Sequence, residues 1–225
     1  LQAEVTEILT EGEGDARRVS GVRTALGETY RCRRVIVCAG TYLSSAVFVG
    51  DVSYPSGPDG LLGANRLSDS LRALGLPLLR FKTGTPPRIA ARSVDFSQLE
   101  RQEGETQSVP FSVRTPADED NGLPTLPCYI VYTNENTHRI IRENLHRSAM
   151  YGGKIHGTGP RYCPSIEDKV VRFADKERHQ LFLEPTGLHT GELYLQGFST
   201  SLPADVQRQM LATLPGFEKA EIMRF

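Results

Sequence analysis

The sequence predicts an α/β fold, and three patterns support that prediction. Residues 35–39 form a short apolar run, followed by Gly40 and Thr41, which is typical of a buried strand in a parallel sheet. β-Branched and aromatic residues gather at 128–133, as they do in other strands. Apolar residues three and four apart at 203–214 indicate an amphipathic helix. Strands and helices therefore both contribute to the predicted fold.

The composition is that of a globular protein. The chain has 225 residues, of which 39% are hydrophobic and 24% are charged, so it can bury a core and fits one or two domains. The net charge of -1 neither supports nor excludes a nucleic-acid partner, since local patches can bind where the total does not. No run of about 18 apolar residues occurs, so we expect no membrane span.

The four cysteines are too scattered to indicate a metal site or a disulfide framework. Cys32, Cys38, Cys128 and Cys163 form no C-x-x-C pair and no cysteine–histidine spacing of the zinc type, so we expect no bound metal. In a chain of this size they indicate a reducing compartment. No charged and apolar leader opens the sequence, and no initiator Met does either. We therefore expect a cytoplasmic protein of which this chain is a piece.

The first forty residues predict an antiparallel meander that leads into the buried strand. Alternating apolar runs at 1–9, 19–26 and 30–34 are separated by turn residues, which favours three short strands. In open α/β sheets, ligands lie beyond the carboxyl ends of the strands. Gly40 and Thr41 would then line a cofactor crevice. A plain tight turn after a core strand explains the same residues equally well.

The next stretch predicts a loop, a helix, a strand and a second candidate binding loop. A loop rich in Gly and Pro at 51–63 precedes a helix at 65–74, and 78–81 indicates a strand. The following loop reads K-T-G-T-P-P-R from Lys82 to Arg88. Its two hydroxyls, two cations and one glycine suit a phosphate, although a rigid solvated loop has the same composition. Residues 89–127 are polar and broken, which indicates a domain boundary near Arg88.

The second half predicts strands at 128–133, 170–174, 180–184 and 193–195, and helices from Asn136 or Thr137 to 145 and at 203–214. The first of these helices, with its exit, is basic. Such a face either meets RNA phosphates or is merely solvated. The basic residues are His138, Arg139, Arg142, His146 and Arg147.

The stretch from Gly157 to Phe173 is the strongest candidate site. It reads G-T-G-P-R-Y-C-P-S-I-E-D-K-V-V-R-F and surrounds Cys163 with glycine and proline. Ser165 and Asp168 have the spacing of a capping box, so a helical turn with free N–H groups begins just after the cysteine. Together with flanking cations, those groups favour the thiolate. A reactive cysteine on an anion-binding loop and a buried cysteine in a tight turn both remain open here.

The meander followed by V-I-V-C-A-G-T resembles the glutathione-reductase-like flavoproteins, which carry two dinucleotide-binding domains. In that class a G-x-G-x-x-G motif opens the first Rossmann unit, and no such motif occurs in this sequence. The resemblance implies part of an FAD-binding, Rossmann-type domain with an inserted α+β second domain. Residues 1–88 and 196–225 would belong to the FAD-binding domain, and 89–195 would form the inserted domain with the cysteine loop.

Three motifs give a closer resemblance. K-T-G-T-P-P-R at 82–88, G-P-R-Y-C-P-S-I-E-D-K-V-V-R-F at 159–173 and S-T-S-L-P at 199–203 are similar to those of the MnmG family of tRNA uridine 5-carboxymethylaminomethyl modification enzymes, also called GidA or glucose-inhibited division protein A. The resemblance implies an FAD enzyme of the bacterial cytoplasm that modifies C5 of the wobble uridine in tRNA. It further implies NADH, 5,10-methylenetetrahydrofolate and the GTPase MnmE, with a homodimer forming a heterotetramer with MnmE.

The same resemblance assigns the site residues. By this resemblance Cys163 would be catalytic. As a chemical hypothesis, its thiolate adds to C6 of the uracil or carries a one-carbon unit, and Asp168 or Glu167 moves the C5 proton. Val5, Gly40, Thr41 and Ala64 would contact FAD. The nicotinamide nucleotide would meet a continuous run of fifteen residues. They are Gly159, Pro160, Arg161, Tyr162, Cys163, Pro164, Ser165, Ile166, Glu167, Asp168, Lys169, Val170, Val171, Arg172 and Phe173.

One loop departs from the family pattern, and two other functions compete. The family's G-G-R-A-G-D-P-P-S reads S-G-P-D-G-L-L-G-A at 56–64, so its Arg becomes Pro58 and its FAD-contacting Ser becomes Ala64, unless Asn65 replaces it. A folate- and FAD-dependent methyltransferase of the T-loop uridine is the nearest alternative enzyme. A non-catalytic RNA-binding module is the alternative from another class, supported only by the basic helix.

Overall fold

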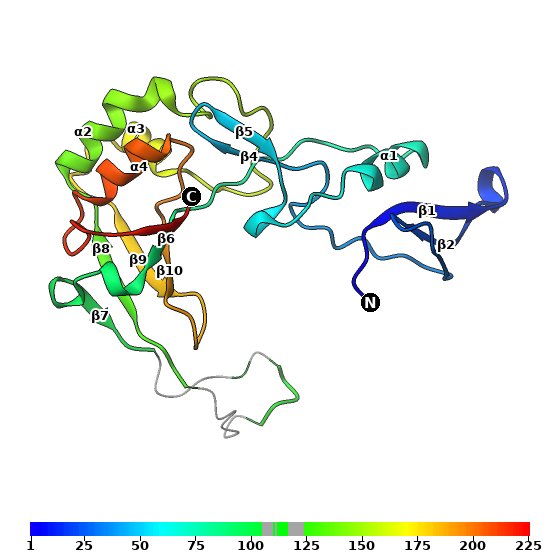
Figure 1. The fold of residues 1–225 in the computed structure, drawn as a ribbon, viewed down its shortest axis with the longest axis horizontal. Coiled ribbons are helices and arrows are strands. Elements are labelled where there is room, and N and C mark those ends of the chain that lie inside the picture. The colour runs from blue at the N-terminus through cyan, green and yellow to red at the C-terminus, as the bar shows by residue number, and fades with distance from the viewer. Residues whose placement is uncertain (105–109, 111, 117–123) are drawn as a thin grey trace. The chain divides into compact units, whose positions relative to one another are not determined.

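A computed structural model describes residues 1–104, 110, 112–116 and 124–225 (Figure 1). Contacts divide the chain into two compact units. Unit 1 consists of residues 1–81 and 156–158, and unit 2 consists of 82–155 and 159–225. No helix in the described part of the chain has the length and apolar character needed to cross a membrane.

Unit 1 contains the predicted meander. Strands β1 (Val5–Glu11), β2 (Arg18–Thr24) and β3 (Thr29–Arg31) form an antiparallel sheet in the order β1-β2-β3. The predicted helix is also present as α1 (Asn65–Ala73), whose Leu67 and Leu71 pack on Ile8 of β1. A hydrogen bond from Ile8 N to Ser70 Oγ, 2.9 Å long, ties helix to sheet.

A further hairpin and two short helices complete unit 1. Strands β4 (Ala46–Val49) and β5 (Val52–Pro55) pair antiparallel, and neither was predicted. The 3-10 helices are η1 (Gly14–Ala16) and η2 (Pro58–Gly60). The second of these lies in the loop rich in Gly and Pro, so that loop is more ordered than its composition indicates.

The predicted buried strand at 34–41 is wrong for this structure. All of these residues are described, and none lies in a strand. Val35 packs partly against the Ile8 cluster, but Ile36 is 86% exposed. A parallel strand needs neighbours on its hydrogen-bonding edges, and the three-stranded sheet of unit 1 ends at β1 and β3. The predicted strand at 78–81 is likewise reduced to one bridge between Phe81 and Thr158.

Unit 2 is built on a six-stranded antiparallel sheet in the order β11-β6-β10-β9-β8-β7. Strands β8, β9 and β10 match predicted strands. Strands β6, β7 and β11, which have three residues each, were not predicted. The strands are β6 (Arg88–Ala90), β7 (Glu100–Gln102), β8 (Cys128–Tyr132), β9 (Gln180–Pro185), β10 (Glu192–Gln196) and β11 (Ile222–Arg224).

Three α-helices pack with this sheet. They are α2 (Glu135–Asn144), α3 (Ile166–Arg172) and α4 (Ala204–Leu211), and α2 contacts both of the others. Short 3-10 helices lie at η3 (Ala91–Ser93), η4 (Phe96–Gln98) and η5 (Leu145–Arg147). Figure 1 shows α2, α3 and α4 gathered on one side of unit 2.

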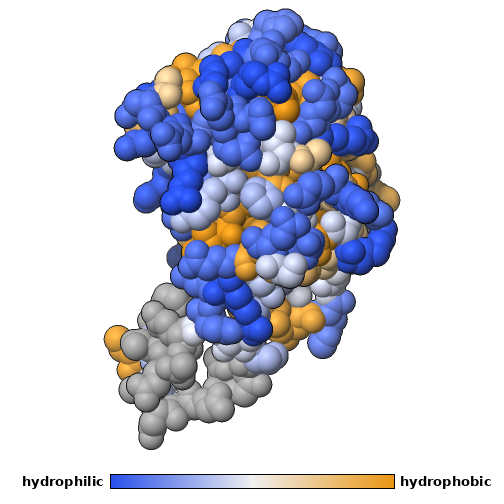
Figure 2. All heavy atoms as spheres, turned by 90° about the vertical axis from the view of Figure 1, so that its left-hand side faces the viewer, coloured by the Kyte–Doolittle hydropathy of each residue, from blue (hydrophilic) through white to orange (hydrophobic). Residues whose placement is uncertain are grey.

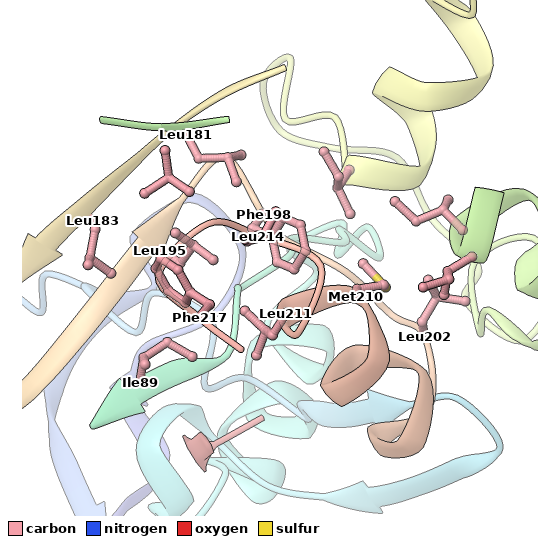
Figure 3. Packing of buried hydrophobic residues seen from close by; sticks show 14 of the residues in the cluster. Ile89, Leu181, Leu183, Leu195, Phe198, Leu202, Met210, Leu211, Leu214 and Phe217 are labelled. Carbon is pink, nitrogen blue, oxygen red and sulfur yellow. The ribbon is translucent and has the colours of Figure 1, made fainter. Parts of the chain in front are cut away.

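The core of unit 2 lies between helices and sheet. Leu181, Leu183 and Leu195 from the strands and Met210 from α4 are fully buried, and Figure 3 shows them around Phe198. Burial of each such side chain contributes roughly 1.5–3 kcal/mol. The face seen in Figure 2 is mostly hydrophilic, with smaller hydrophobic patches between the polar side chains.

One prediction for unit 2 needs correction. Residues 170–174 do not form a strand, because the turn that begins at Ser165 continues as α3 to Arg172. Ile166 and Val170 lie one turn apart on this helix, and both are buried in the core.

The compact units differ from the predicted domain division. Residues 196–225 pack into the same core as much of 89–195, and the division falls after Phe81 instead of Arg88. The buried residues after 196 that join this core explain the difference, since they pack on strands and helices of the segment before them. The assignment of residues to an FAD-binding domain and an inserted domain stays a prediction.

Candidate functional site

The cysteine loop ends in the predicted capping box. Ser165 Oγ accepts a hydrogen bond from Asp168 N at 3.1 Å, and Asp168 Oδ2 accepts one from Ser165 N at 3.0 Å. Two backbone donors at the start of α3 are thereby satisfied. The approach to the cysteine is tight, because a Cβ on Gly159 would lie 2.7 Å from the carbonyl oxygen of Arg161. Glycine is needed at this position for steric reasons.

Cys163 is exposed, and a lysine of α3 interacts with it electrostatically. Burial lowers the pKa of Lys169, and the charge of Cys163 opposes that shift. Lys169 Nζ donates to the carbonyl oxygen of Gly197 at 2.9 Å, which holds the ammonium group in place. The sulfur is therefore open to solvent, which rules out the interpretation of a buried cysteine in a tight turn, while its reactivity stays a prediction.

Asp168 is a largely buried carboxylate that is held from two sides. It is 7% exposed, and besides capping α3 it accepts a hydrogen bond at Oδ1 from the hydroxyl of Tyr151 at 3.1 Å. Burial raises the pKa of Tyr151 to about 12, and the charge of Asp168 and this hydrogen bond add to the effect. Tyr151 stays protonated near neutral pH. Because Tyr151 is 40% exposed, its hydroxyl connects the buried Asp168 to the surface.

Glu167 points into the interior instead. It is 0% exposed, and its Oε1 accepts hydrogen bonds from Ser201 N at 3.0 Å and from Ser148 Oγ at 3.3 Å. Oε2 has no hydrogen-bond partner among the residues that the structure describes. Burial raises the pKa of Glu167, and the hydrogen bond from Ser201 opposes the shift. The two adjacent carboxyls therefore occupy different environments.

The fifteen-residue nucleotide motif divides into a surface part and a core part. Ile166 and Val170 belong to the hydrophobic core, and Glu167 and Asp168 are buried. Gly159, Pro164, Ser165 and Lys169 are half-buried. The residues free to meet a ligand are the exposed ones, which are Pro160, Arg161, Tyr162, Cys163, Val171, Arg172 and Phe173.

The three motifs singled out in the sequence meet in unit 2. Ile166 N donates to the carbonyl oxygen of Ser199 at 2.7 Å, and Thr200 N donates to that of Thr85 at 3.3 Å. A Cβ on Gly84 would lie 3.2 Å from the Cβ of Ser199. The 199–203 loop therefore lies between the cysteine loop and the loop at 82–88.

The loop at 82–88 offers fewer phosphate ligands than its composition indicates. Arg88 donates to Thr85 Oγ1 at 2.8 Å and to the carbonyl oxygen of Pro86 at 2.7 Å. Its guanidinium also lies 4.4 Å from the ring centroid of Tyr194 and 3.8 Å from Glu192. Arg88 thus stabilises the fold, and Lys82 is the cation of this loop that remains for a ligand.

The four residues assigned to FAD all lie in unit 1. Val5 and Ala64 pack against the same cluster around Ile8. Gly40 has a φ of 51°, a Cβ at this position would meet no other atom within 4 Å, and Thr41 is exposed beside it. Ala64 is the N-cap residue of α1, and its side chain makes no capping hydrogen bond. Uncapped N–H groups suit an anionic ligand group.

The basic helix that supported an RNA-binding module is largely neutralised. His138 is buried, Arg139 pairs with Glu143 at 3.1 Å, and Arg147 forms a two-pronged pair with Asp205 at 2.9 and 3.0 Å. Within the described ranges, no group of three or more His, Cys, Asp or Glu residues is arranged to hold a metal ion.

Sequence reasoning missed Tyr151 and Ser148, which lie in a turn without a motif of its own. The S-T-S-L-P motif drew attention to Ser201, but its contact with Glu167 joins residues 34 positions apart and is not readable from local patterns.

Comparisons with known proteins match the whole chain. The family model described as glucose inhibited division protein A matches residues 1–225. A protein of Lachnoclostridium phytofermentans named tRNA uridine 5-carboxymethylaminomethyl modification enzyme MnmG is 52% identical over 99% of the chain, which covers 35% of that relative. A Bacillus velezensis protein of the same name is 51% identical over 98% of the chain and is covered to 34%.

Solved structures agree with this match and with the predicted α/β fold class. The structure of Aquifex aeolicus GidA in its form I crystal aligns with a TM-score of 0.85 and 47% identity, covering 99% of this chain and 37% of that one. The form II crystal gives a TM-score of 0.84 and 44% identity. The chain spans about a third of the length of the relatives that it matches. With a family model that covers every residue and relatives of about 50% identity, the chain belongs to the glucose-inhibited division protein A family.

Proposed function

We propose that this chain is part of an FAD-dependent enzyme that installs a carboxymethylaminomethyl or aminomethyl group at C5 of the wobble uridine in tRNA. The name shared by its relatives supports the tRNA substrate and the reaction class. The observation that carries the proposal is Cys163, exposed on a glycine- and proline-rich loop just before the capping box that opens α3.

The chemistry begins with the thiolate of Cys163. Its sulfur forms a bond to C6 of the uracil, and the C5–C6 π electrons move toward C5, which becomes nucleophilic. C5 would then bond to the one-carbon unit while the bond between that carbon and its folate carrier breaks, and glycine or ammonium would supply the amine nitrogen. The C5 proton leaves to a carboxylate, the C6–sulfur bond breaks, the C5–C6 double bond returns and the thiolate is regenerated.

The proton at C5 is assigned to Asp168 or Glu167. Asp168 is the better placed of the two, because it accepts a hydrogen bond from the hydroxyl of Tyr151, a residue that is 40% exposed. Glu167 is fully buried and accepts hydrogen bonds from Ser201 and Ser148.

The residues present are compatible with the nucleotide cofactors of the proposal. FAD would meet Val5, Gly40, Thr41 and Ala64, where the uncapped start of α1 suits a phosphate. NADH would meet the exposed part of the 159–173 motif, led by Arg161. When bound, FAD and NADH supply the redox equivalents, and 5,10-methylenetetrahydrofolate supplies the carbon unit. The proposed partner is the GTPase MnmE. The enzyme would form a homodimer that joins MnmE in a heterotetramer, and it would lie in the cytoplasm.

Replacement of Cys163 by Ser in the full-length enzyme tests the covalent step. We expect loss of the modified wobble nucleoside by at least about a hundredfold, because a serine hydroxyl is a far weaker nucleophile near neutral pH. The measurement is nucleoside analysis of tRNA from a strain that carries only the variant. Glu177→Ala, at an exposed position after α3, serves as the control.

Nucleoside analysis of tRNA from a knockout strain separates the alternatives, and loss of the 5-aminomethyl-type wobble uridine there would support the proposed function. Loss of ribothymidine instead would indicate the T-loop methyltransferase, and no change in any nucleoside would indicate a non-catalytic RNA-binding module. Wild-type levels of the wobble nucleoside in the Cys163→Ser strain would show that the covalent role is wrong.

A further inference from the structure

The two adjacent carboxyls at the start of α3 have different surroundings. Asp168 closes the capping box and faces Tyr151, whereas Glu167 turns away from the helix surface and is 0% exposed. Burial of this carboxyl is costly, and its Oε2 has no hydrogen-bond partner among the described residues, so the hydrogen bonds that Oε1 accepts have to hold it. The groups that donate hydrogen bonds to Glu167 therefore indicate its role.

Those partners belong to two other segments. Glu167 Oε1 accepts from Ser201 N at 3.0 Å and from Ser148 Oγ at 3.3 Å. The two serines also contact one another, with their hydroxyl oxygens 2.8 Å apart, and both are buried. One carboxylate oxygen thus joins the first turn of α3 to the 199–203 loop and to the turn at Ser148.

The same segments surround the base of the cysteine loop. The carbonyl oxygen of Ser199 accepts the N–H of Ile166, the first residue of α3. Ser201 Oγ accepts the N–H of Met150, next to Tyr151, which in turn binds Asp168. Contacts on both sides therefore fix the position at which the chain enters α3, and Cys163 lies two residues before the N-cap.

We propose that Glu167 is a positioning residue whose buried carboxyl fixes the 199–203 loop and Ser148 against the first turn of α3 and so determines how Cys163 is presented. This inference rests on the proposed reactivity of Cys163. It predicts that Glu167 acts through the hydrogen bonds that Oε1 accepts, which leaves the C5 proton of the proposed reaction to Asp168. Gln, which keeps an acceptor at Oε1, should then substitute for Glu, and Ala should not.

The test is the reactivity of Cys163 itself. Wild-type protein and the Glu167→Ala and Glu167→Gln variants are treated with iodoacetamide from pH 6 to pH 9, and alkylation of each cysteine is followed by peptide mass spectrometry. We expect Glu167→Ala to slow Cys163 at least about fivefold at pH 7, because the hydrogen bonds that hold the 199–203 loop and Ser148 against the first turn of α3 are lost. Glu167→Gln should stay within about twofold of wild type.

Two controls make the result specific. Exposed Cys38, in unit 1, reports in the same sample and should react equally in every variant. Glu177→Ala removes an exposed glutamate that follows α3 and should leave Cys163 unchanged. If Glu167→Ala does not fold by circular dichroism, Ser148→Ala, which removes one donor to Oε1, decides the question and should slow Cys163 by a smaller factor.

Either of two results overturns the inference. One is a wild-type rate profile of Cys163 in folded Glu167→Ala, or in Ser148→Ala where the first variant fails to fold. The other is a Glu167→Gln variant as slow as Glu167→Ala, which would mean that the charge matters and the geometry does not. Retained tRNA modification by Cys163→Ser would refute the proposed function alone, since the alkylation rates are measured without tRNA.

Discussion

At the scale of the residue, Arg88 shows how a side chain that suits a ligand can serve the fold. Its guanidinium lies over Tyr194 and donates to Thr85 and to the carbonyl oxygen of Pro86. It also lies near Glu192, whose side chain is 14% exposed and pairs with Arg224 at 2.7 Å as well. These contacts hold β6 to β10 and to the residues just before β6, Thr85 and Pro86.

Replacement of Arg88 by Met tests this role. We expect the free energy of unfolding to fall by about 1–3 kcal/mol, because two hydrogen bonds and one partner of a largely buried carboxylate are lost. Urea unfolding followed by circular dichroism measures the change. Arg92→Met is the matched control, since the Arg92 side chain is 76% exposed and its ion pair with Glu221 is worth about 0–1 kcal/mol. Equal losses in the two variants would contradict the assignment.

Prediction at this scale succeeded where the signal was local. The capping box between Ser165 and Asp168 follows from a spacing of three residues, and the structure contains it. The exposure of Cys163 was one of two open interpretations. The difference between Glu167 and Asp168 was not predictable, because it depends on Ser201 and Tyr151, which reach the site from distant parts of the chain.

At the scale of the element, the start of α2 depends on one side chain. Asn134 Oδ1 accepts from Thr137 N at 3.1 Å, and Asn134 Nδ2 donates to the carbonyl oxygen of Thr213 at 2.6 Å. The residue therefore caps α2 and ties it to the segment after α4. The sequence indicated a cap two or three residues later, at Asn136 or Thr137, because Asn and Thr are both favoured at the N-cap.

Replacement of Asn134 by Ala should cost about 1–2 kcal/mol of unfolding free energy, because the cap and the tie to Thr213 are both lost. Asn134→Asp keeps an oxygen that accepts from Thr137 N and loses only the donor, so it should recover about half of the loss. Thermal and urea unfolding measure both variants. An Asp variant as unstable as the Ala variant would show that the tie to Thr213, not the cap, matters.

Longer periodic segments were predictable, and short ones were not. The meander, β8, β9 and α4 follow from alternation or from apolar spacings of three and four over five or more residues. Strands β6, β7 and β11 have three residues each and lie in no longer alternating run, whereas β3, which is equally short, lies in the alternating run at 30–34. The prediction at 170–174 failed because two adjacent valines favour a strand, while the capping box and the burial of Ile166 and Val170 stabilise a helix.

At the scale of the whole molecule, two neighbouring histidines make stability depend on pH. Burial lowers the pKa of His138, and the charges of His179 and Arg142 add to the shift, while Glu135 opposes it. Burial lowers the pKa of His179, and the positive charge of Lys169 lowers it further. The two rings lie 5.1 Å apart, and His138 Nε2 is 2.7 Å from Thr133 Oγ1. Protonation of both would place two cations between α2 and the start of β9.

The sign of the effect follows from these directions. The unfolded chain binds protons at the ordinary histidine pKa of about 6.5, above the folded values, so it takes up more protons below that pH. The stabilisation by neutral histidines is present above about pH 6.5 and is lost as pH falls from there through the folded pKa values. Urea unfolding between pH 5 and 7.5 should show stability rising with pH.

Variants assign this slope to its residues. His138→Gln should flatten the dependence on pH, and His189→Gln, at an exposed position, should leave it unchanged. A slope of the same size in His138→Gln would show that other groups cause it.

The composition of the chain does not reveal how its compact units are built. The polar stretch after Arg88 predicts a domain boundary there, whereas the units divide after Phe81 and unit 1 also takes in 156–158. Phe198, Leu202 and Leu214 join the core of unit 2, and no local pattern indicates which of two cores a segment will enter.

Ser201 uses its backbone and its side chain for four partners, one of which is the N–H of Met150 on its hydroxyl. Its N–H binds Glu167, its carbonyl oxygen accepts from Ala149 N at 3.2 Å, and its hydroxyl faces that of Ser148. Natural variation at positions 148 and 201 should consequently be correlated, with small hydroxyl-bearing or paired apolar residues replacing one another in concert. An engineer who wished to alter the cysteine loop would do best to diversify these two serines together and to leave the surface residues around the sulfur as they are.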